Sequence, residues 1–272
     1  MFSINDFKVV QNNIFSTSPL IHCITNPISI NDCANFVLAV GAKPIMAEHP
    51  LEVEEITSRA NALAVNIGNI TDARLKSIRL AAKKADKLSI PWIIDIVGVN
   101  CSKLRFNYVN ELINDFHPCV IKGNMSEIKA ISRIESHGKG IDVTKADATT
   151  NENIAENVLI ANNLAQKYKT VVIASGKIDI ITDGNITYAV ENGCELMSLI
   201  TGTGCILNVL TGTMLSVTEP LKSGVIATAL LGVAGELADN SKGTGSFKTS
   251  LLDMVSTMTA EKISEYAKIK IV

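Results

Sequence analysis

The chain has 272 residues, of which 47% are hydrophobic, 4% aromatic and 19% charged, and its formal net charge is −2. This length fits one large α/β domain or two small ones, and the aliphatic content predicts a large buried core. A nearly balanced charge gives no electrostatic basis for binding nucleic acid or anionic membranes, so we expect neither as a partner.

The cysteine pattern and the first residues indicate a cytoplasmic protein. None of the six cysteines forms a CxxC pair, and no histidine pair completes a zinc pattern. We therefore expect reduced thiols in a cytosolic environment. The first ten residues, MFSINDFKVV, lack the basic and apolar regions of a signal peptide. The apolar stretch 224–235 is shorter than the roughly 20 residues that a membrane span needs, which predicts a buried helix.

Short β-branched runs alternate with longer helical patterns along the first two thirds of the chain. Strands are predicted at 19–25, 43–47, 62–66, 92–97, 119–123 and 170–175. Between them, 29–41 predicts a helix with Ser29 as N-cap and Gly41 at C′, and 71–86 predicts a helix with a Thr-Asp start. Apolar strands without alternation predict a mostly parallel central sheet covered by helices on both faces.

The later part of the chain departs from this alternation. Asp183-Gly184 lies between β-rich runs, which predicts a small hairpin near 178–191. From residue 203 onward the pattern is nearly all helical. No linker-like tract or internal repeat appears, so we interpret 1–272 as a single domain.

Polar residues follow several of the predicted strands. In open parallel sheets ligands bind beyond the carboxyl ends of the strands, so these side chains should line one crevice. The polar ones are Asn26, Asn66, Asn69, Asp95, Lys122, Asn124, Glu127 and Ser175, and Met46, Ala47, Gly68 and Gly176 stand at the same strand ends.

Two of these residues, Asp95 and Glu127, are carboxylates that suit a magnesium–nucleotide site, because Mg²⁺ takes one or two carboxylates together with water and phosphate oxygens. Alternatively, Glu127 closes a capping box with Asn124, and both roles can coexist. Lys122 is either a phosphate ligand or a solvated strand end.

Residues 200–205 read ITGTGC and precede an apolar helical run. Glycines at this point let the backbone N–H groups of Thr203 and Gly204 approach a phosphate at a helix N-terminus. Close helix–strand packing is the alternative use of such a turn. A cysteine, Cys205, stands where phosphate chemistry would more naturally use a carboxylate.

Several stretches, in order, resemble the hydroxyethylthiazole kinases of thiamin salvage, a branch of the ribokinase-like superfamily. They are HCITNPISINDCANFVLAVGAKPIMAEHPLEVEEI, ALAVNIGN, WIIDIVG, IKGNMSEI, VVIASGKIDIITDG and TGTGC, and they extend from about residue 20 to 215. The resemblance implies a ribokinase-like fold. It also implies ATP- and Mg²⁺-dependent phosphorylation of the hydroxyl of 4-methyl-5-(2-hydroxyethyl)thiazole, by a homotrimer with active sites between subunits.

The resemblance assigns roles position by position. Cys205 replaces the Asp that most ribokinase-like enzymes use as the base, and a helix N-terminus would lower the pKa of its thiol. The thiazole pocket would include Asn26, Met46, Gly202 and Asn69. ATP would bind at Lys122, Ser175, Thr203 and Gly204, and the metal at Asp95 and Glu127. In a trimer, the side of the subunit with Asn26 and Met46 would face the ITGTGC segment of a neighbour, residues 200–205, here called the glycine turn.

One position departs from the family pattern, because Ile96 stands where the family usually has a proline after the Asp. Two alternatives stay open: a related kinase for another small alcohol, such as a hydroxymethylpyrimidine or pyridoxal, and a non-catalytic nucleotide-binding protein. Among the histidines, we expect His22 to be a hydrogen-bonded core residue, His49 to lie beside the pocket, and His117 and His137 to lie in loops.

Overall fold

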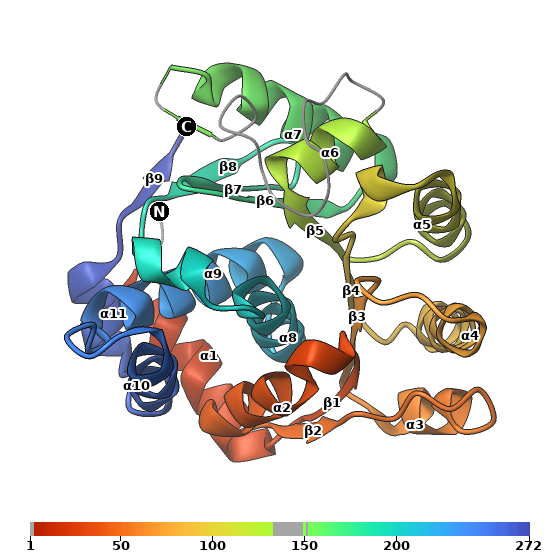
Figure 1. Ribbon diagram of the computed structural model, residues 1–272, viewed down its shortest axis with the longest axis horizontal. Helices are drawn as coiled ribbons and strands as arrows, with labels where there is room; N and C mark the ends of the chain where they lie inside the picture. Colours follow the sequence, from red (N-terminus) through yellow and green to blue (C-terminus); the bar gives the residue numbers. More distant parts are fainter. Residues whose placement is uncertain (1–2, 133–148, 151) are drawn as a thin grey trace.

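A central β-sheet organises the computed structural model, which describes residues 3–132, 149–150 and 152–272 (Figure 1). The strand order is β2-β1-β3-β4-β5-β6-β7-β8-β9. The strands are β1 Leu20–Ile24, β2 Lys43–Ile45, β3 Ala62–Asn66, β4 Trp92–Asp95, β5 Val120–Asn124, β6 Val171–Ser175, β7 Asp179–Thr182, β8 Thr187–Val190 and β9 Ile269–Ile271. The pairings among β1 to β6 are parallel and those from β6 to β9 are antiparallel, which confirms the mostly parallel sheet and the hairpin.

The last strand, β9, was not predicted from the sequence. It is only three residues long, and residues 270–272 are exposed. Its register against β8 pairs Ile269 with Val190 and Ile271 with Tyr188. A strand this short forms because β8 offers unpaired backbone groups beside it, so the sequence of 269–271 alone does not predict a strand.

Helices cover both faces of the sheet, as predicted (Figure 1). One face carries α1, α2 and α8 to α11, and the other carries α3 to α7. The helices are α1 Ile4–Thr17, α2 Ile30–Ala39, α3 Val53–Arg59, α4 Asp72–Leu88, α5 Lys103–Phe116, α6 Met125–Ile131, α7 Ile154–Tyr168, α8 Thr203–Leu215, α9 Pro220–Leu237, α10 Thr244–Ser256 and α11 Ala260–Tyr266. Within the described residues, three short 3₁₀ segments each lead from a strand to the next helix: η1 Pro27–Ser29, η2 Val99–Cys101 and η3 Glu195–Leu199.

The two helix starts predicted from the sequence are present, with one difference. Thr71 caps α4, since its hydroxyl accepts the N–H of Arg74 at 3.2 Å. Ser29 holds the N-cap position of α2 but makes no side-chain cap bond, because its hydroxyl donates instead to the Asn26 carbonyl at 3.1 Å. Gly41 follows α2 with φ of 92°, as a C′ glycine does.

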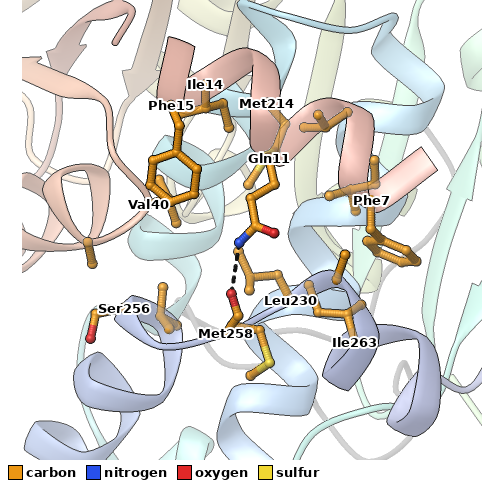
Figure 2. Close-up of a pocket in the computed structure, with 15 residues that line it drawn as sticks. Phe7, Gln11, Ile14, Phe15, Val40, Met214, Leu230, Ser256, Met258 and Ile263 are labelled. Atoms are coloured by element: carbon orange, nitrogen blue, oxygen red, sulfur yellow. Dashed lines mark hydrogen bonds between the residues drawn. The ribbon is translucent and has the colours of Figure 1, made fainter. Parts of the chain in front are cut away.

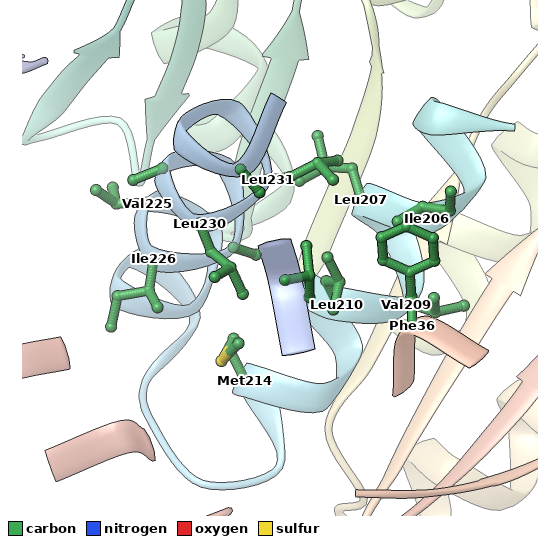
Figure 3. Packing of buried hydrophobic residues seen from close by; sticks show 14 of the residues in the cluster. Phe36, Ile206, Leu207, Val209, Leu210, Met214, Val225, Ile226, Leu230 and Leu231 are labelled. Carbon is green, nitrogen blue, oxygen red and sulfur yellow. The ribbon is translucent and has the colours of Figure 1, made fainter. Parts of the chain in front are cut away.

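The core on the α8 face is built around α8 and α9, whose aliphatic side chains interlock (Figure 3). Glycine brings α8 close to the sheet, because a Cβ on Gly212 would lie 3.1 Å from the Ala64 Cβ of β3, closer than an ordinary contact. α9 is long and apolar enough to cross a membrane, but 72% of that apolar window is buried in the fold. It is therefore a core helix, in agreement with the prediction for 224–235.

The predictions for His22 and His117 are confirmed, and the one for His49 stays a prediction. His22 is buried, with Nδ1 2.9 Å from the Thr57 hydroxyl and Nε2 2.8 Å from the Ala47 carbonyl. His49 is exposed and accepts the N–H of Leu51 at 3.2 Å. His117 is exposed just after α5, and His137 lies outside the described residues.

Candidate active site

Three adjacent parallel strands place Asn66, Asp95 and Lys122 side by side at their carboxyl ends. Lys122 Nζ lies 2.8 Å from Asp95 Oδ2, and the two side chains are only 4% and 2% exposed. Burial alone lowers the pKa of Lys122, but the charge of Asp95 and the hydrogen bond outweigh it and raise the pKa overall. Lys122 is therefore a buried cation, and its interpretation as a solvated strand end is wrong.

Cys205, in the first turn of α8, joins this group through Asn66. The Asn66 amide nitrogen donates to Asp95 Oδ2 at 3.0 Å and to Cys205 Sγ at 3.5 Å. Burial and the charge of Asp95 raise the pKa of the Cys205 thiol, although hydrogen bonds with Ser29 and Asn66 and the charge of Lys122 act against them. The expectation of a lowered thiol pKa is therefore wrong for the protein without ligands, because burial beside a carboxylate outweighs the helix terminus.

The capping box predicted for Glu127 is confirmed. Glu127 Oε2 accepts the N–H of Asn124 at 2.7 Å, and Asn124 Oδ1 accepts the N–H of Glu127 at 2.9 Å. The second carboxylate oxygen, Oε1, accepts the N–H of Gly98 at 2.7 Å. Burial and the nearby charge of Asp95 raise the pKa of Glu127 to about 7.

The donor set fits a magnesium ion that keeps most of its water and phosphate ligands. Asp95 Oδ1 is buried and lacks a hydrogen-bond partner among the described residues, so this oxygen can take a cation. Both oxygens of Glu127 already accept backbone N–H groups, which suits contact with a metal through water. Residues 3–132, 149–150 and 152–272 contain no cluster of three His, Cys, Asp or Glu side chains that could hold a metal alone. Magnesium bound to nucleotide needs only one or two protein carboxylates.

Ile96, which stands in place of the family's proline, strengthens the link between β4 and β5. Its N–H donates to the Lys122 carbonyl at 2.8 Å, which continues the parallel pairing one residue beyond Asp95. Proline has no N–H and would lose this bond. The side chain of Ile96 is fully buried and fills the space above Gly123, where a Cβ would lie 2.8 Å from its Cγ1.

The glycine turn lies against both Ser29 and Lys122. Gly202 has φ of 97°, and a Cβ there would be 3.1 Å from the Ser29 Cβ. A Cβ on Gly204 would be 3.2 Å from Lys122 Nζ, so the first turn of α8 directly faces the buried cation. The Thr203 hydroxyl donates to the Met197 carbonyl at 3.2 Å. A helix N-terminus beside a lysine offers the N–H groups and positive charge that phosphates require.

The pocket residues implied by the resemblance lie on neighbouring loops. Asn26 approaches the site closely, since a Cβ on Gly68 would lie 2.5 Å from its Nδ2. Met46 is partly buried against the core cluster that Cys205 also contacts. Asn69 is exposed, and its carbonyl accepts from Arg74. Ser175 lies farther along the sheet, where its hydroxyl donates to the Gly123 carbonyl at 3.3 Å.

Two arginines that hold these loops were missed by the sequence analysis. Arg74 is buried, forms an ion pair with Glu48, and donates to the carbonyls of Asn66 and Asn69 at 3.4 and 3.0 Å. Arg105 donates to the carbonyls of Ile67 and Gly68 at 2.6 and 2.8 Å. In the sequence both arginines look like ordinary polar residues of a helix, and only the folded loops show their partners.

A separate apolar cavity lies between α1 and the C-terminal helices (Figure 2). Its volume is about 40 Å³, and Gln11 Nε2 donates to the Met258 carbonyl at 2.9 Å within it. Met214, at the end of α8 opposite Cys205, lines this cavity. A space of this size admits only water-sized molecules, so it does not compete with the strand ends as a nucleotide site.

Comparison with known proteins identifies the family. The model of the hydroxyethylthiazole kinase family matches residues 12–261. The chain is 51% identical to hydroxyethylthiazole kinase 2 of Clostridium botulinum, with 96% of this chain and 98% of the relative aligned. It is 40% identical to hydroxyethylthiazole kinase 1 of Methanosphaera stadtmanae, with 98% of each aligned.

Solved structures agree with this comparison. The hydroxyethylthiazole kinase protein of Pyrococcus horikoshii superposes with a TM-score of 0.89 at 32% identity and covers 99% of this chain and 100% of its own. Pyridoxal kinase from Staphylococcus aureus, solved with ADP, shares the fold, with a TM-score of 0.63 at 12% identity over 93% of this chain and 98% of its own. The fold is therefore ribokinase-like, and the chain belongs to the hydroxyethylthiazole kinase family.

Proposed function

We propose that this protein transfers the γ-phosphoryl group of ATP to the hydroxyl of 4-methyl-5-(2-hydroxyethyl)thiazole, with Mg²⁺ as cofactor. The observation that carries the proposal is the convergence of Asp95, Lys122 and Cys205 beside the glycine turn. The chain that carries this arrangement has 51% sequence identity to a kinase named for this substrate.

The residues around Cys205 divide the work of phosphoryl transfer. Lys122 and the backbone N–H groups of Thr203 and Gly204 bind the charged phosphate oxygens, and Ser175 contacts the nucleotide. Asp95 would hold Mg²⁺ through Oδ1, which lacks a hydrogen-bond partner among the described residues, with Glu127 behind it. A cation held there would neutralise phosphate charge and would offset the charge of Asp95 that raises the pKa of the Cys205 thiol. Such reactions depend mainly on positioning and electrostatics.

Cys205 is proposed as the proton acceptor. Its thiolate takes the proton of the substrate hydroxyl while the hydroxyl oxygen forms a bond to the γ-phosphorus. The bond between the γ-phosphorus and the bridging oxygen breaks, which leaves ADP, the phosphate ester and a neutral thiol. Asn26, Met46, Asn69 and Gly202 are proposed to hold the thiazole. Asn26 lies against Gly68, and Ser29 lies against Gly202, three residues before Cys205.

We also propose a single cytoplasmic kinase domain over residues 1–272 that assembles as a trimer with active sites between subunits. One sheet runs from β2 to β9, and all six cysteines are free, in keeping with a reducing compartment.

The proposed subunit interface has exposed apolar side chains. Ile28, Leu51 and Leu199 are 67%, 89% and 63% exposed. Such side chains suit a subunit interface. The same chain's Ser29 already lies against Gly202, so a neighbour would complete this pocket rather than supply its glycine turn.

The deciding experiment measures ADP release from purified protein with Mg-ATP and the hydroxyethylthiazole, beside a hydroxymethylpyrimidine and pyridoxal. We expect turnover on the thiazole alone, and loss of turnover when the metal is chelated. Turnover on another alcohol would keep the kinase chemistry and reject the proposed pocket. ATP binding without turnover on any of the three would favour a nucleotide-binding protein without catalysis.

Substitution at Cys205 tests the proton acceptor. We expect Cys205→Ala to lose most of kcat, by roughly 10²-fold or more, since general-base catalysis contributes 10²–10⁴-fold. Cys205→Asp should keep or raise kcat, because a carboxylate can accept the same proton. Equal rates for the wild type and both variants would reject the role of Cys205.

A further inference from the structure

Asn66 is fully buried, and its side-chain amide lies between the Asp95–Lys122 ion pair and Cys205. Its Nδ2 donates to Asp95 Oδ2 at 3.0 Å and to Cys205 Sγ at 3.5 Å. Its Oδ1 accepts the N–H of Gly68 at 2.8 Å. The side chain thus joins residues that lie 29 and 139 positions away in the sequence.

The orientation of this amide is fixed by its partners. The N–H of Gly68 requires an acceptor, and the carboxylate of Asp95 requires a donor. Rotating the amide by 180° would set two oxygens against each other at Asp95 and two donors against each other at Gly68. One Nδ2 hydrogen is therefore held on Asp95, and the other remains for the sulfur of Cys205.

We propose that Asn66 is a positioning residue for the proton-transfer step: it donates a hydrogen bond to Cys205 Sγ that favours the thiolate and fixes the sulfur for the substrate hydroxyl. This inference rests on the proposed role of Cys205. In the step described above, Asn66 neither gains nor loses a proton. It donates to the sulfur before the transfer, when the acceptor is anionic and the bond is strongest.

Other groups also act on Cys205, so the contribution of Asn66 must be separated from theirs. The charged or titratable neighbours are Asp95 on β4, Lys122 on β5 and Cys33 on α2, and Glu127 acts on both members of the ion pair. The Ser29 hydroxyl is a further hydrogen-bond partner of the thiol. Asn66 differs from these groups, because its uncharged amide donates to the sulfur of Cys205 and also to Asp95.

The first test measures the rate at which iodoacetamide alkylates Cys205 between pH 7 and 10, followed on the Cys205 peptide by mass spectrometry. At a given pH we expect Asn66→Ala to react about tenfold more slowly, the effect of losing one hydrogen bond to a charged group. Asn66→Asp should react more slowly still, because it replaces the donor by a like charge. An unchanged rate in both variants would overturn the proposal.

A matched control distinguishes this effect from general loosening. Asn208 is also a fully buried asparagine, and its Nδ2 donates to the Val65 carbonyl of the same strand at 3.1 Å. Asn208→Ala should lower the melting temperature and leave the alkylation rate of Cys205 within about twofold of wild type. An equal slowing in Asn208→Ala would mean that any damage near β3 has this effect, and the proposal would fall.

A double-mutant cycle separates Cys205 from Asp95, since Asn66 touches both. Asn66→Ala should lower kcat about tenfold in the wild type and much less in a Cys205→Ala background, because the residue that it positions is absent there. The KM for ATP should change less than kcat. Equal losses in the two backgrounds would mean that Asn66 acts through Asp95 alone, contrary to the proposal.

The two proposals can fail separately. Alkylation needs no substrate, so a slower reaction in the Asn66 variants would support the contact with Cys205 even if the thiazole were not phosphorylated. Conversely, thiazole turnover combined with unchanged alkylation would keep the function and reject this role of Asn66. Asn66→Asp has the same size as asparagine and still accepts from Gly68, so it serves as the test if Asn66→Ala does not fold.

Discussion

Two carboxylates and one lysine share a buried space at the carboxyl ends of β4 and β5. Lys122 neutralises Asp95 directly, whereas the described residues offer Glu127 only backbone N–H partners within hydrogen-bond distance. A buried charge of this kind is costly unless it is paired or hydrogen-bonded. Burial and the nearby charge of Asp95 outweigh the two backbone hydrogen bonds, so the ionisation of Glu127 is unfavourable, which has a measurable consequence for stability.

The raised pKa of Glu127 predicts how stability varies with pH. Its pKa is about 7 in the folded protein against 4.5 for an ordinary glutamate, so the folded state binds the proton more tightly. The stabilisation from this proton is fully present below pH 4.5 and is lost as pH rises through about 7. We expect Glu127→Gln to remove this contribution and reduce the loss of unfolding free energy between pH 5 and 8 by about 2–3 kcal/mol.

Urea denaturation at several pH values in this range measures the difference. Asp179 has a pKa raised by burial to about 7 as well, so the Glu127→Gln variant should keep part of the pH dependence. Glu265→Gln on α11 provides the control, because that carboxylate is exposed. If wild type and Glu127→Gln showed the same slope, Glu127 would already be ionised at pH 5.

At the scale of the elements, α9 packs against its surroundings through glycines. A Cβ on Gly224 would lie 2.9 Å from the Ile181 Cγ2, and one on Gly232 would lie 2.7 Å from the Asn192 carbonyl oxygen. Isoleucine can shift slightly, but a backbone carbonyl has little freedom to do so. Asn192 is itself held by bonds from its side chain to Glu236 and to the Tyr266 carbonyl.

Gly232→Ala should therefore destabilise the protein, even though alanine favours helices more than glycine by about 1 kcal/mol. We expect a loss of about 1–3 kcal/mol in the free energy of unfolding, the usual cost of overpacking. Gly245→Ala in α10 is the matched control, since none of the described residues outside its own helix turn comes within 4 Å of the added Cβ. Denaturant curves should show Gly245→Ala unchanged or slightly stabilised. A stable Gly232→Ala would mean that the loop at Asn192 moves freely.

At the scale of the whole molecule, exposed apolar side chains gather on segments next to the site. Ile28 lies in η1, directly after Asn26, and Leu51 lies in the loop that follows Met46. Leu199 ends η3, just before the glycine turn. These three side chains are where the proposed subunit interface would lie.

We expect light scattering at micromolar concentration to give the mass of a trimer. Leu51→Asp should shift the protein toward monomer and lower kcat, because it places a charge in the proposed interface and opens the site. Leu88→Asp is the control, since Leu88 is 47% exposed at the far end of α4. A fully active monomer in the wild type would rule out active sites between subunits.

Predictions from the sequence succeeded where local pattern dominates. The six parallel strands, the hairpin at Asp183-Gly184 and the capping of α4 by Thr71 follow from apolar periodicity and turn chemistry over a few residues. β9 escaped prediction because its short segment pairs only when the edge of β8 is present. The Asn124–Glu127 capping box is likewise local and was readable in advance.

The sequence by itself determined the fold class, from the alternation of apolar runs and helical patterns, and it indicated the family through the ordered stretches that resemble it. Only the tertiary structure decided which side chains meet at the candidate site, because their contacts join strands and a helix that are far apart in the chain. Asn66 reaches Cys205 across 139 positions, and Lys122 reaches Asp95 across 27. The thiol pKa is raised rather than lowered for the same reason: burial and a neighbouring charge are properties of the folded surroundings, which no local pattern contains.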